Sequence, residues 1–205
     1  MWEAGNTASL SSSKRKIIIQ TIHNIMAICT LNRDLLRTNS CGYQLAEVKD
    51  IYLANMADVT ATTVSASTDT GCTGEELTSI SLGSGGKFYH IEPQKNSVNF
   101  TDELVVTDNG AKYRTHTLTF SISGQYDACT HLDFDALSLG KYFAVVVTAE
   151  GKWLALGRIG GLEAESATLA GGSDQNGITV TLSANVAESA LPLSTAAINT
   201  VKGGA

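Results

Sequence analysis

A long β-hairpin predicted between Ser97 and Ser123 is the feature that most constrains the fold of this chain. Its arms, Ser97–Thr107 and Lys112–Ser123, both alternate apolar with polar residues, which is the period of a β-strand with one buried face. The arms are joined by Asp108-Asn109-Gly110. An Asn-Gly step between alternating runs predicts a tight hairpin turn, because both central residues of the favoured turn need a positive φ.

The outward face of this hairpin carries Thr and Ser and few charges. Monomeric proteins usually protect such a surface with Lys or with a covering element, whereas a bare surface suits pairing with another copy. The sequence therefore favours assembly over catalysis. We predict an inter-subunit sheet formed by residues of both arms, namely Val98, Phe100, Leu104, Val106, Arg114, Thr115, Thr117, Thr119 and Ser121.

The composition fits a subunit that its neighbours cover. Hydrophobic residues make up 43% of the 205 residues and charged residues only 17%. A Thr/Ser-rich secreted or viral β-protein would have a similar composition, so composition leaves both readings open. The formal charge of −6 argues against a nucleic-acid-binding face, which needs clustered Lys and Arg.

Residues 1–40 are interpreted as an extension of the main domain. The apolar stretch Ile17–Ile28 is too short and too polar for a membrane span. A translation start at Met26 would make residues 1–25 an over-called start. The cysteines show no Cys-x-x-Cys spacing, which favours free thiols in a reducing compartment over a zinc site; they are Cys29, Cys41, Cys72 and Cys129.

The remaining pattern predicts a mainly β domain over residues 41–192 with one flanking helix. Tyr142–Thr148 is an almost continuous apolar run, as expected for a central strand buried on both faces. The helix is expected over Thr130–Leu139, with Thr130 as its N-cap. Further strands are expected over Leu45–Asn55, Thr78–Leu82, Lys87–Glu92, Lys152–Ile159, Leu162–Leu169 and Ile178–Val186. The predicted core comprises Phe120, Phe143–Val147, Trp153 and Leu182.

Two segments are expected to lack regular structure. Asp58–Gly74 is rich in Thr, Ser, Asp and Gly and predicts a long polar loop, and loops of that length are usually functional or disordered. Residues 193–205 predict a frayed C-terminal tail of small residues.

No motif for catalysis or cofactor binding is recognisable. The chain lacks a Gly-x-Ser-x-Gly, a His-Glu-x-x-His, a phosphate-binding loop and a calcium loop. His116 lies on the same strand face as Leu118 and Phe120, which favours a packed imidazole over a base. The acidic pair Asp102-Glu103 interrupts the first hairpin arm and predicts a bulge, a bend or protection of an edge. We therefore expect no enzyme, no cofactor and no metal.

Five segments together carry a resemblance to a known family: Ala46–Asn55, the long hairpin, Thr130–Leu139, Gly151–Arg158 with Gly160-Gly161-Leu162, and Asp174–Leu182. Their order resembles that of phage major tail tube proteins, virion structural proteins of phages infecting Bacteroidetes-type hosts. The resemblance covers about residues 42–190.

The resemblance implies an antiparallel β-sandwich or half-barrel with a long hairpin and one flanking α-helix. In that family, subunits form a ring, commonly of six, whose inner strands join into one barrel, and stacked rings form a tube that conducts DNA during ejection. The implied partners are further copies of the chain, other tail proteins (terminator, tape measure, baseplate or sheath) and DNA, which passes through the lumen without sequence-specific binding. No membrane is implied; assembly would take place in the host cytoplasm, and the product would reside in the virion.

A loop near Asp58–Gly74 reaches the adjacent ring in that family. We therefore predict ring-stacking contacts at Asp58, Thr62, Asp69 and Thr70. Two other functions stay open. A head–tail connector or tail terminator would form a single ring on a related fold. A β-sandwich receptor- or glycan-binding module would need exposed aromatic side chains, and aromatic residues make up only 6% of the chain.

Overall fold

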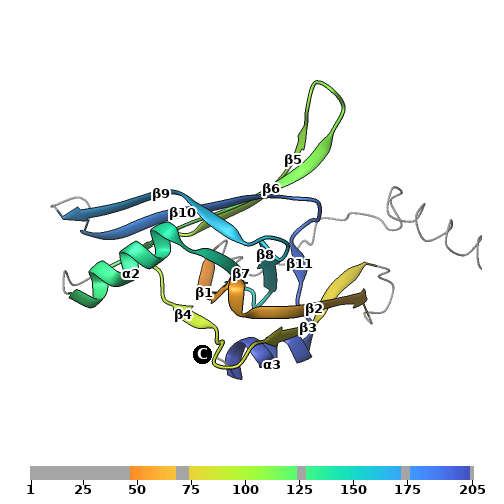
Figure 1. The fold of residues 1–205 in the computed structure, drawn as a ribbon, viewed down its shortest axis with the longest axis horizontal. Helices are drawn as coiled ribbons and strands as arrows, with labels where there is room; N and C mark the ends of the chain where they lie inside the picture. Colours follow the sequence, from red (N-terminus) through yellow and green to blue (C-terminus); the bar gives the residue numbers. More distant parts are fainter. Residues whose placement is uncertain (1–46, 68–73, 124–127, 172–175, 204–205) are drawn as a thin grey trace, which may run out of the picture. The chain divides into compact units, whose positions relative to one another are not determined.

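In the computed structural model (Figure 1), which describes residues 47–67, 74–123, 128–171 and 176–203, strand β7 (Lys141–Thr148) lies at the centre of the fold. Its side chains alternate between two apolar clusters: Tyr142, Ala144 and Val146 contribute to one, and Phe143 and Val145 to the other. A strand that is buried on both faces needs apolar residues at every position. The predicted central strand is confirmed.

The main sheet has nine strands and consists of two parts that meet at β7. In the first part β7 pairs with β1 (Val48–Asn55) and β8 (Trp153–Leu156), while β4 (Tyr89–Ile91) extends β1 and β11 (Leu191–Pro192) extends β8. The second part runs in the order β9, β10, β6, β5, with bounds Leu162–Gly171, Asn176–Val186, Lys112–Ile122 and Asn99–Val106. All of these pairings are antiparallel.

The two parts of the sheet pack face to face and enclose the first apolar cluster. Among the described residues, strand pairing joins them only where Lys141 and Tyr142 of β7 pair with Glu163 and Leu162 of β9. The cluster combines side chains of both parts, among them Ile51, Leu53, Leu118, Phe120, Val180 and Leu182. The expected mainly β, sandwich-like architecture is therefore present. Of the predicted core, Phe120, Phe143–Val147 and Leu182 are buried, whereas Trp153 is half-buried against the second cluster.

The opposite face of β7 is covered by a hairpin, of which only the second strand was predicted, over Thr78–Leu82, and by a helix that was not predicted. The segment expected to be a long polar loop contains β2 (Val59–Ala66), which follows the short 3-10 helix η1 (Met56–Asp58) and pairs with β3 (Glu75–Leu82). The loop prediction is wrong for these residues because β2 is rich in Thr and Val, which are good strand formers. Leu77 and Ile80 of β3 enter the second cluster.

The predicted frayed tail is also wrong for most of its length, since α3 spans Thr195–Gly203. Ser194 caps this helix by accepting the N–H of Ala197 at 3.4 Å. Ala197 and Val201 lie one turn apart and are both buried in the second cluster. Small residues let the helix approach the sheet closely, so the composition that suggested a tail belongs to a packed helix.

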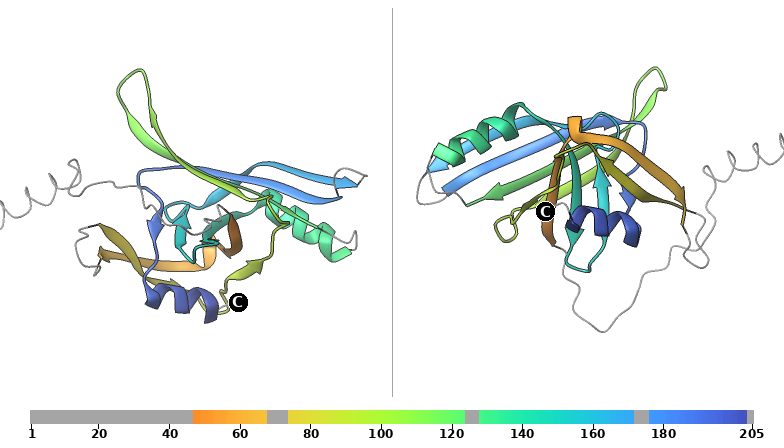
Figure 2. Two further views of the ribbon diagram at one scale, coloured as in Figure 1. Left: turned by 180° about the vertical axis from the view of Figure 1, so that it is seen from behind. Right: turned by 60° about the horizontal axis from the view of Figure 1, so that its bottom comes forward.

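Helix α2 (Ala128–Leu139) packs against the β9–β10 hairpin, and Figure 2 shows it apart from α3 in both views. Phe134 and Leu137 join the first cluster, and Tyr142 donates from Oη to the carbonyl of Ala136 at 2.5 Å. The helix was expected, but it starts at Ala128, so Thr130 lies in its first turn and is not the N-cap. The described chain thus has two α-helices where one was predicted.

The long hairpin is confirmed, with a different turn. The N–H of Gly110 donates to the carbonyl of Thr107 at 2.8 Å, and the N–H of Thr107 donates to the carbonyl of Ala111 at 2.9 Å. Gly110 has φ of 82°, whereas Asn109 keeps a negative φ. This pattern fits a three-residue hairpin loop in which Gly110 forms a bulge, rather than a two-residue turn with two positive φ angles.

We expect Phe120→Ala to lower the free energy of unfolding by about 3–5 kcal/mol, because it leaves a cavity in the first cluster. Leu132→Ala is the matched control, since Leu132 is 68% exposed and its truncation should change stability by less than about 0.5 kcal/mol. Urea unfolding followed by circular dichroism measures both. Equal unfolding midpoints for the two variants would place Phe120 outside the core.

Candidate functional site

The second part of the main sheet has one face that nothing else in the described chain covers, here called the hydroxyl face. It exists because the strands alternate: every second residue points into the first cluster, and the residues between point outward. The outward residues are Asn99 and Thr101 on β5, Thr115, Thr117, Thr119 and Ser121 on β6, Thr179, Thr181, Ser183 and Asn185 on β10, and Ser166 and Thr168 on β9.

Hydroxyl groups on this face bond to one another across strands. Thr119 and Thr181 lie 3.1 Å apart, Ser121 and Thr179 lie 2.8 Å apart, and Thr115 donates to Oδ1 of Asn185 at 2.9 Å. Such cross-strand pairs each stabilise a sheet by a few tenths of a kcal/mol to about 1 kcal/mol. The charged residues that project with them, such as Glu103 and Glu163, are acidic, and Lys and Arg are absent from the outward positions of these four strands.

The predicted inter-subunit residues are divided between the two faces of this sheet. Thr115, Thr117, Thr119 and Ser121 lie on the hydroxyl face. Val98 and Phe100 instead pack against the subunit's own first cluster. Leu104 and Val106 share the inner side with Phe100 but lie beyond the core, where they are 53% and 56% exposed. Arg114, opposite Leu104, binds Asp102.

The end of the long hairpin projects from the body of the subunit, as Figures 1 and 2 show. We call residues Leu104–Tyr113 the arm. β5 is the last strand of the sheet, so its outer side has no strand partner among the described residues. An exposed strand of this kind presents unpaired N–H and C=O groups to another chain.

A second open edge lies at the opposite side of the same four strands. β9 pairs with β10 along one side, and with β7 on its other side only at Leu162 and Glu163. In the described chain, the remaining stretch Ala164–Leu169 has no strand on that second side. The four-stranded part of the sheet therefore has open edges at both ends.

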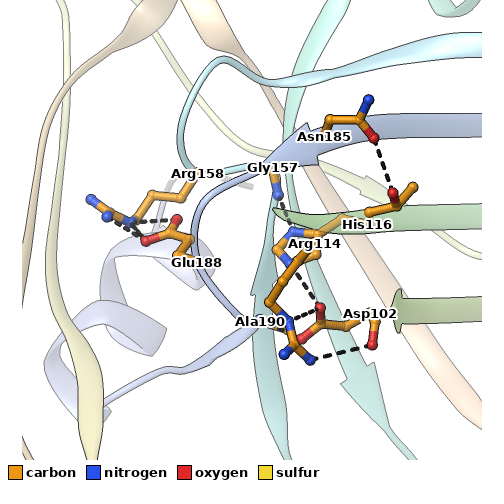
Figure 3. Close-up of polar contacts among 9 residues, drawn as sticks. Asp102, Arg114, His116, Gly157, Arg158, Asn185, Glu188 and Ala190 are labelled. Atoms are coloured by element: carbon orange, nitrogen blue, oxygen red, sulfur yellow. Dashed lines mark hydrogen bonds and ion pairs between the residues drawn. The ribbon is translucent and has the colours of Figure 1, made fainter. Parts of the chain in front are cut away.

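A cluster of polar side chains anchors the base of the arm (Figure 3). Asp102 accepts hydrogen bonds from Nε of Arg114 at 2.5 Å and from the backbone N–H of Ala190 at 2.9 Å. His116 is 1% exposed; its Nδ1 accepts the N–H of Gly157 at 3.2 Å, and its Nε2 lies 3.4 Å from Asp102. The neutral ring therefore carries its proton on Nε2, facing the carboxylate.

Burial and charge set the protonation states in this cluster. Burial lowers the pKa of His116, because the imidazolium would lose its hydration, and the nearby carboxylates of Asp102 and Glu188 offset this only in part. Burial alone would raise the pKa of Asp102, but the hydrogen bonds from Arg114 and Ala190 outweigh it and the pKa is lowered. The cluster thus pairs an ionised Asp102 with a neutral His116.

Asp102, the acidic residue that interrupts the first strand of the long hairpin, therefore has a structural role. β5 and β6 pair without a register shift, which excludes the bulge among the three expected alternatives. A signal for its role was present in the sequence: Asp102 alternates with Phe100 on the inner face, where a carboxylate needs a partner. Arg114 and His116 occupy the same face of the facing strand and supply that partner. The buried His116 confirms the packed imidazole.

An ion pair connects the β2–β3 hairpin to the main sheet. Arg158, in the β8–β9 connection, binds Glu188 through Nε at 2.9 Å and through Nη2 at 2.5 Å, and donates from Nη1 to the hydroxyl of Thr62 at 2.9 Å. A two-pronged Arg–carboxylate pair fixes orientation as well as distance. Thr62, predicted as a loop residue for ring stacking, is thus a strand residue held by this pair.

The other predicted stacking residues have different outcomes. Asp58 ends η1, where its carboxylate accepts from Nδ2 of Asn55 at 3.0 Å, so it is not in a free loop. Asp69 and Thr70 lie outside the described residues, as do the predicted extension over residues 1–40 and the proposed start at Met26.

No family model, no curated protein and no solved structure matches the chain. None of the helices in the described ranges has the length and apolar character needed to span a bilayer. The described residues bring together no group of His, Cys, Asp and Glu that would hold a metal ion. Cys129 is a free, exposed thiol, and the other three cysteines lie outside the described residues.

The protonation states predict how stability depends on pH. Unfolded His116 takes up a proton below about pH 6.5, whereas the folded state resists this, so the unfolded state binds more protons and stability falls as pH drops below that value. Asp102 adds a second loss only at lower pH: its contribution is complete above about pH 3.9, the unfolded value, and is lost as pH falls through its lowered folded pKa.

Urea unfolding between pH 7.5 and about pH 5 measures the first effect. We expect His116→Gln to flatten the pH dependence in this window, while the exposed His131→Gln, its matched control, should leave it unchanged. An unchanged slope in His116→Gln would show that folding does not alter the protonation of His116.

Proposed function

We propose that this protein is a structural subunit, without catalytic activity, that joins head to tail into rings and stacks into a phage tail tube. One observation carries the proposal: a four-stranded sheet with open edges at both ends and one uncovered, hydroxyl-rich face. A surface that repeats at two ends of one subunit forms a ring whenever the rotation between copies closes.

The strand directions suit a ring. β5, β6, β10 and β9 alternate in direction, so the two end strands are antiparallel to one another. When copies are related by rotation about one axis, β5 of each copy runs antiparallel to β9 of the next. Antiparallel pairing is the more stable arrangement and continues the pattern of the subunit's own sheet.

The positions of the two open edges also suit a closed barrel. Through the registers with β6 and β10, β5 lies opposite Thr181 and residues beyond it, whereas the open stretch of β9 lies opposite Ile178–Leu182. The centres of the two edges are thus displaced along the strand direction by about four to five residues, or roughly 15 Å. Measured across the strands, each copy contributes four strands and therefore about 19 Å of sheet. Copies at equal height would then tilt their strands by about 40°, within the range of closed barrels.

The uncovered face would line the channel of such a ring. The inner face of the sheet packs against the subunit's own β1 and β7, so the bodies of the subunits lie on that side. Six copies would contribute about 24 strands, enough to enclose an aqueous channel. The wall presents hydroxyl groups and carboxylates, and no Lys or Arg lies at the described outward positions of its four strands. Lys141 of β7, at the margin of this face, is paired with Glu163, so DNA phosphates would find few free cationic partners.

We propose that the β2–β3 hairpin provides the contact between stacked rings, in place of the polar loop expected from the sequence. Its strands carry exposed Thr and Ser, and the side of β2 away from β3 has no strand partner in the described chain. The protein would then assemble with other tail proteins in the host cytoplasm and reside in the virion.

Negative-stain electron microscopy of the purified full chain tests this function over a range of protein concentrations. Long tubes support a tail tube protein. Discrete rings that never stack favour a connector or terminator. A protein that stays monomeric at every concentration overturns the proposal and leaves the binding-module reading.

Two proline variants, Ala167→Pro and Thr168→Pro, test the open edge of β9. Ala167 and Thr168 are adjacent, so one N–H points to β10 and the other to the open edge. We expect the variant that keeps the β10 ladder to unfold cooperatively like wild type but to remain monomeric in sedimentation velocity, because it has lost an edge donor. The other variant serves as the control and should be less stable. Normal assembly of both variants would exclude β9 from the interface.

Charge on the β2–β3 hairpin tests the stacking contact. Thr63→Glu combined with Ser65→Glu places two carboxylates at exposed positions that make no contact with either apolar cluster. We expect rings to form as in wild type and tubes to become shorter, because facing rings repel one another. Tube lengths in micrographs measure this. Tubes of wild-type length at low ionic strength would exclude the hairpin from stacking.

A further inference from the structure

Leu139, at the end of α2, is the most exposed large apolar side chain in the described chain, at 85%. It belongs to neither apolar cluster, and it lies immediately before Gly140 and β7. Exposed apolar side chains of this size mark contact surfaces when a second apolar patch is available to cover them. The arm carries such a patch, formed by Leu104 and Val106.

The two patches lie at opposite edges of the four strands. The arm continues β5, the strand at one edge, whereas Leu139 immediately precedes β7, which pairs with β9 at the other edge. The arm of one copy therefore does not reach its own Leu139. A second copy is the occupant that the geometry admits, because the proposed ring brings these two ends together.

The registers place the arm at this position. If β5 of one copy pairs with the open stretch of the next copy's β9, the pairing can continue only as far as Ala164. From Glu163 onward, that side of β9 is taken by Lys141 of β7. The residues of β5 that follow, Leu104–Val106, therefore arrive where α2 ends and β7 begins, two residues from Leu139.

The faces agree as well. Leu104 and Val106 project on the same side of the sheet as Phe100, which is the inner side. The inner side of β9 is the side on which α2 packs, since Phe134 and Leu137 contact the first cluster there. In the proposed ring, the apolar side chains of the arm and the C-terminal end of α2 of the next copy would thus both lie on the inner side of the sheet.

We propose that the arm of each copy packs on the α2–β7 junction of the next, with Leu104 and Val106 covering Leu139. This contact rests on the proposed ring. We call it the clasp: the apolar contact of Leu104 and Val106 of one copy with Leu139 of the next, outside the shared sheet. It accounts for the exposure of three apolar side chains that the isolated subunit leaves in water.

Leu139→Glu tests the clasp, and Leu132→Glu is the matched control, because Leu132 is also an exposed leucine of α2 but lies two turns away. Sedimentation velocity gives the concentration at which each variant assembles. We expect Leu139→Glu to raise that concentration by at least about tenfold, with an unchanged thermal unfolding midpoint of the monomer. Leu132→Glu should assemble like wild type.

A charge pair makes the test specific to the proposed neighbours. Val106→Glu alone and Leu139→Lys alone should each weaken assembly, and combining them should restore it in part, because the two charges then face one another. Assembly of Leu139→Glu at the wild-type concentration, equal loss in Leu132→Glu, or no recovery in the double variant would overturn the clasp. If the β9 proline variant blocks assembly while Leu139→Glu does not, only the clasp fails; a monomeric wild type overturns the ring and the clasp together.

Discussion

The burial of β7 on both faces is the constraint on which the rest of the structure depends. One face of β7 is covered by the β9-β10-β6-β5 part of the sheet, and the other by β3 and α3. Each outer layer can therefore use only one of its own faces for the core. The outward face of the four strands is left without an apolar partner, and this explains why Thr and Ser occupy every second position there.

The Asp102 cluster marks the boundary between core and arm. Up to Phe100, the inner side chains of β5 meet the first cluster; at the next inner position the sequence changes to a carboxylate, which binds Arg114 and the N–H of Ala190. These bonds join β5, β6 and the segment leading to β11. Beyond the cluster, Leu104 and Val106 have no core to enter. The Asp102 cluster thus fixes the point at which the hairpin extends beyond the core. The side chains of Leu104 and Val106, which follow it, remain exposed.

Much of the fold was predictable, because it follows from local periodicity. The apolar run of β7, the alternation in β6 and β10, and the Gly110 turn each identify an element without knowledge of its partners. β2 and α3 were missed because their apolar positions are few and small. α3 is anchored by Ala197 and Val201, whose burial depends on Phe88 and Phe143 from distant parts of the chain. Tertiary packing decides such segments, and periodicity does not reveal it.

The candidate site was predictable only in part, for a related reason. The hydroxyl face follows from alternation, but the open edge of β9 depends on where β7 stops pairing, which is a property of the folded sheet. The exposure of Leu104 and Leu139, on which the proposed contact between copies depends, follows in the same way from where the core ends. As apolar residues at strand and helix periodicity they suggest burial within the subunit, and only the structure shows that they lie beyond it.

The hydroxyl face also explains how a sheet can remain uncovered and yet be stable. Thr119 with Thr181 and Ser121 with Thr179 satisfy one another across the strands, so the face gains from its own contacts without an apolar cover. A lysine-rich face would bind phosphate groups and hold DNA in place, and a densely acidic face would repel itself across a closed ring. Paired hydroxyl groups avoid both costs. In the proposed tube, this chemistry would let a polyanion move past the wall that the subunits form.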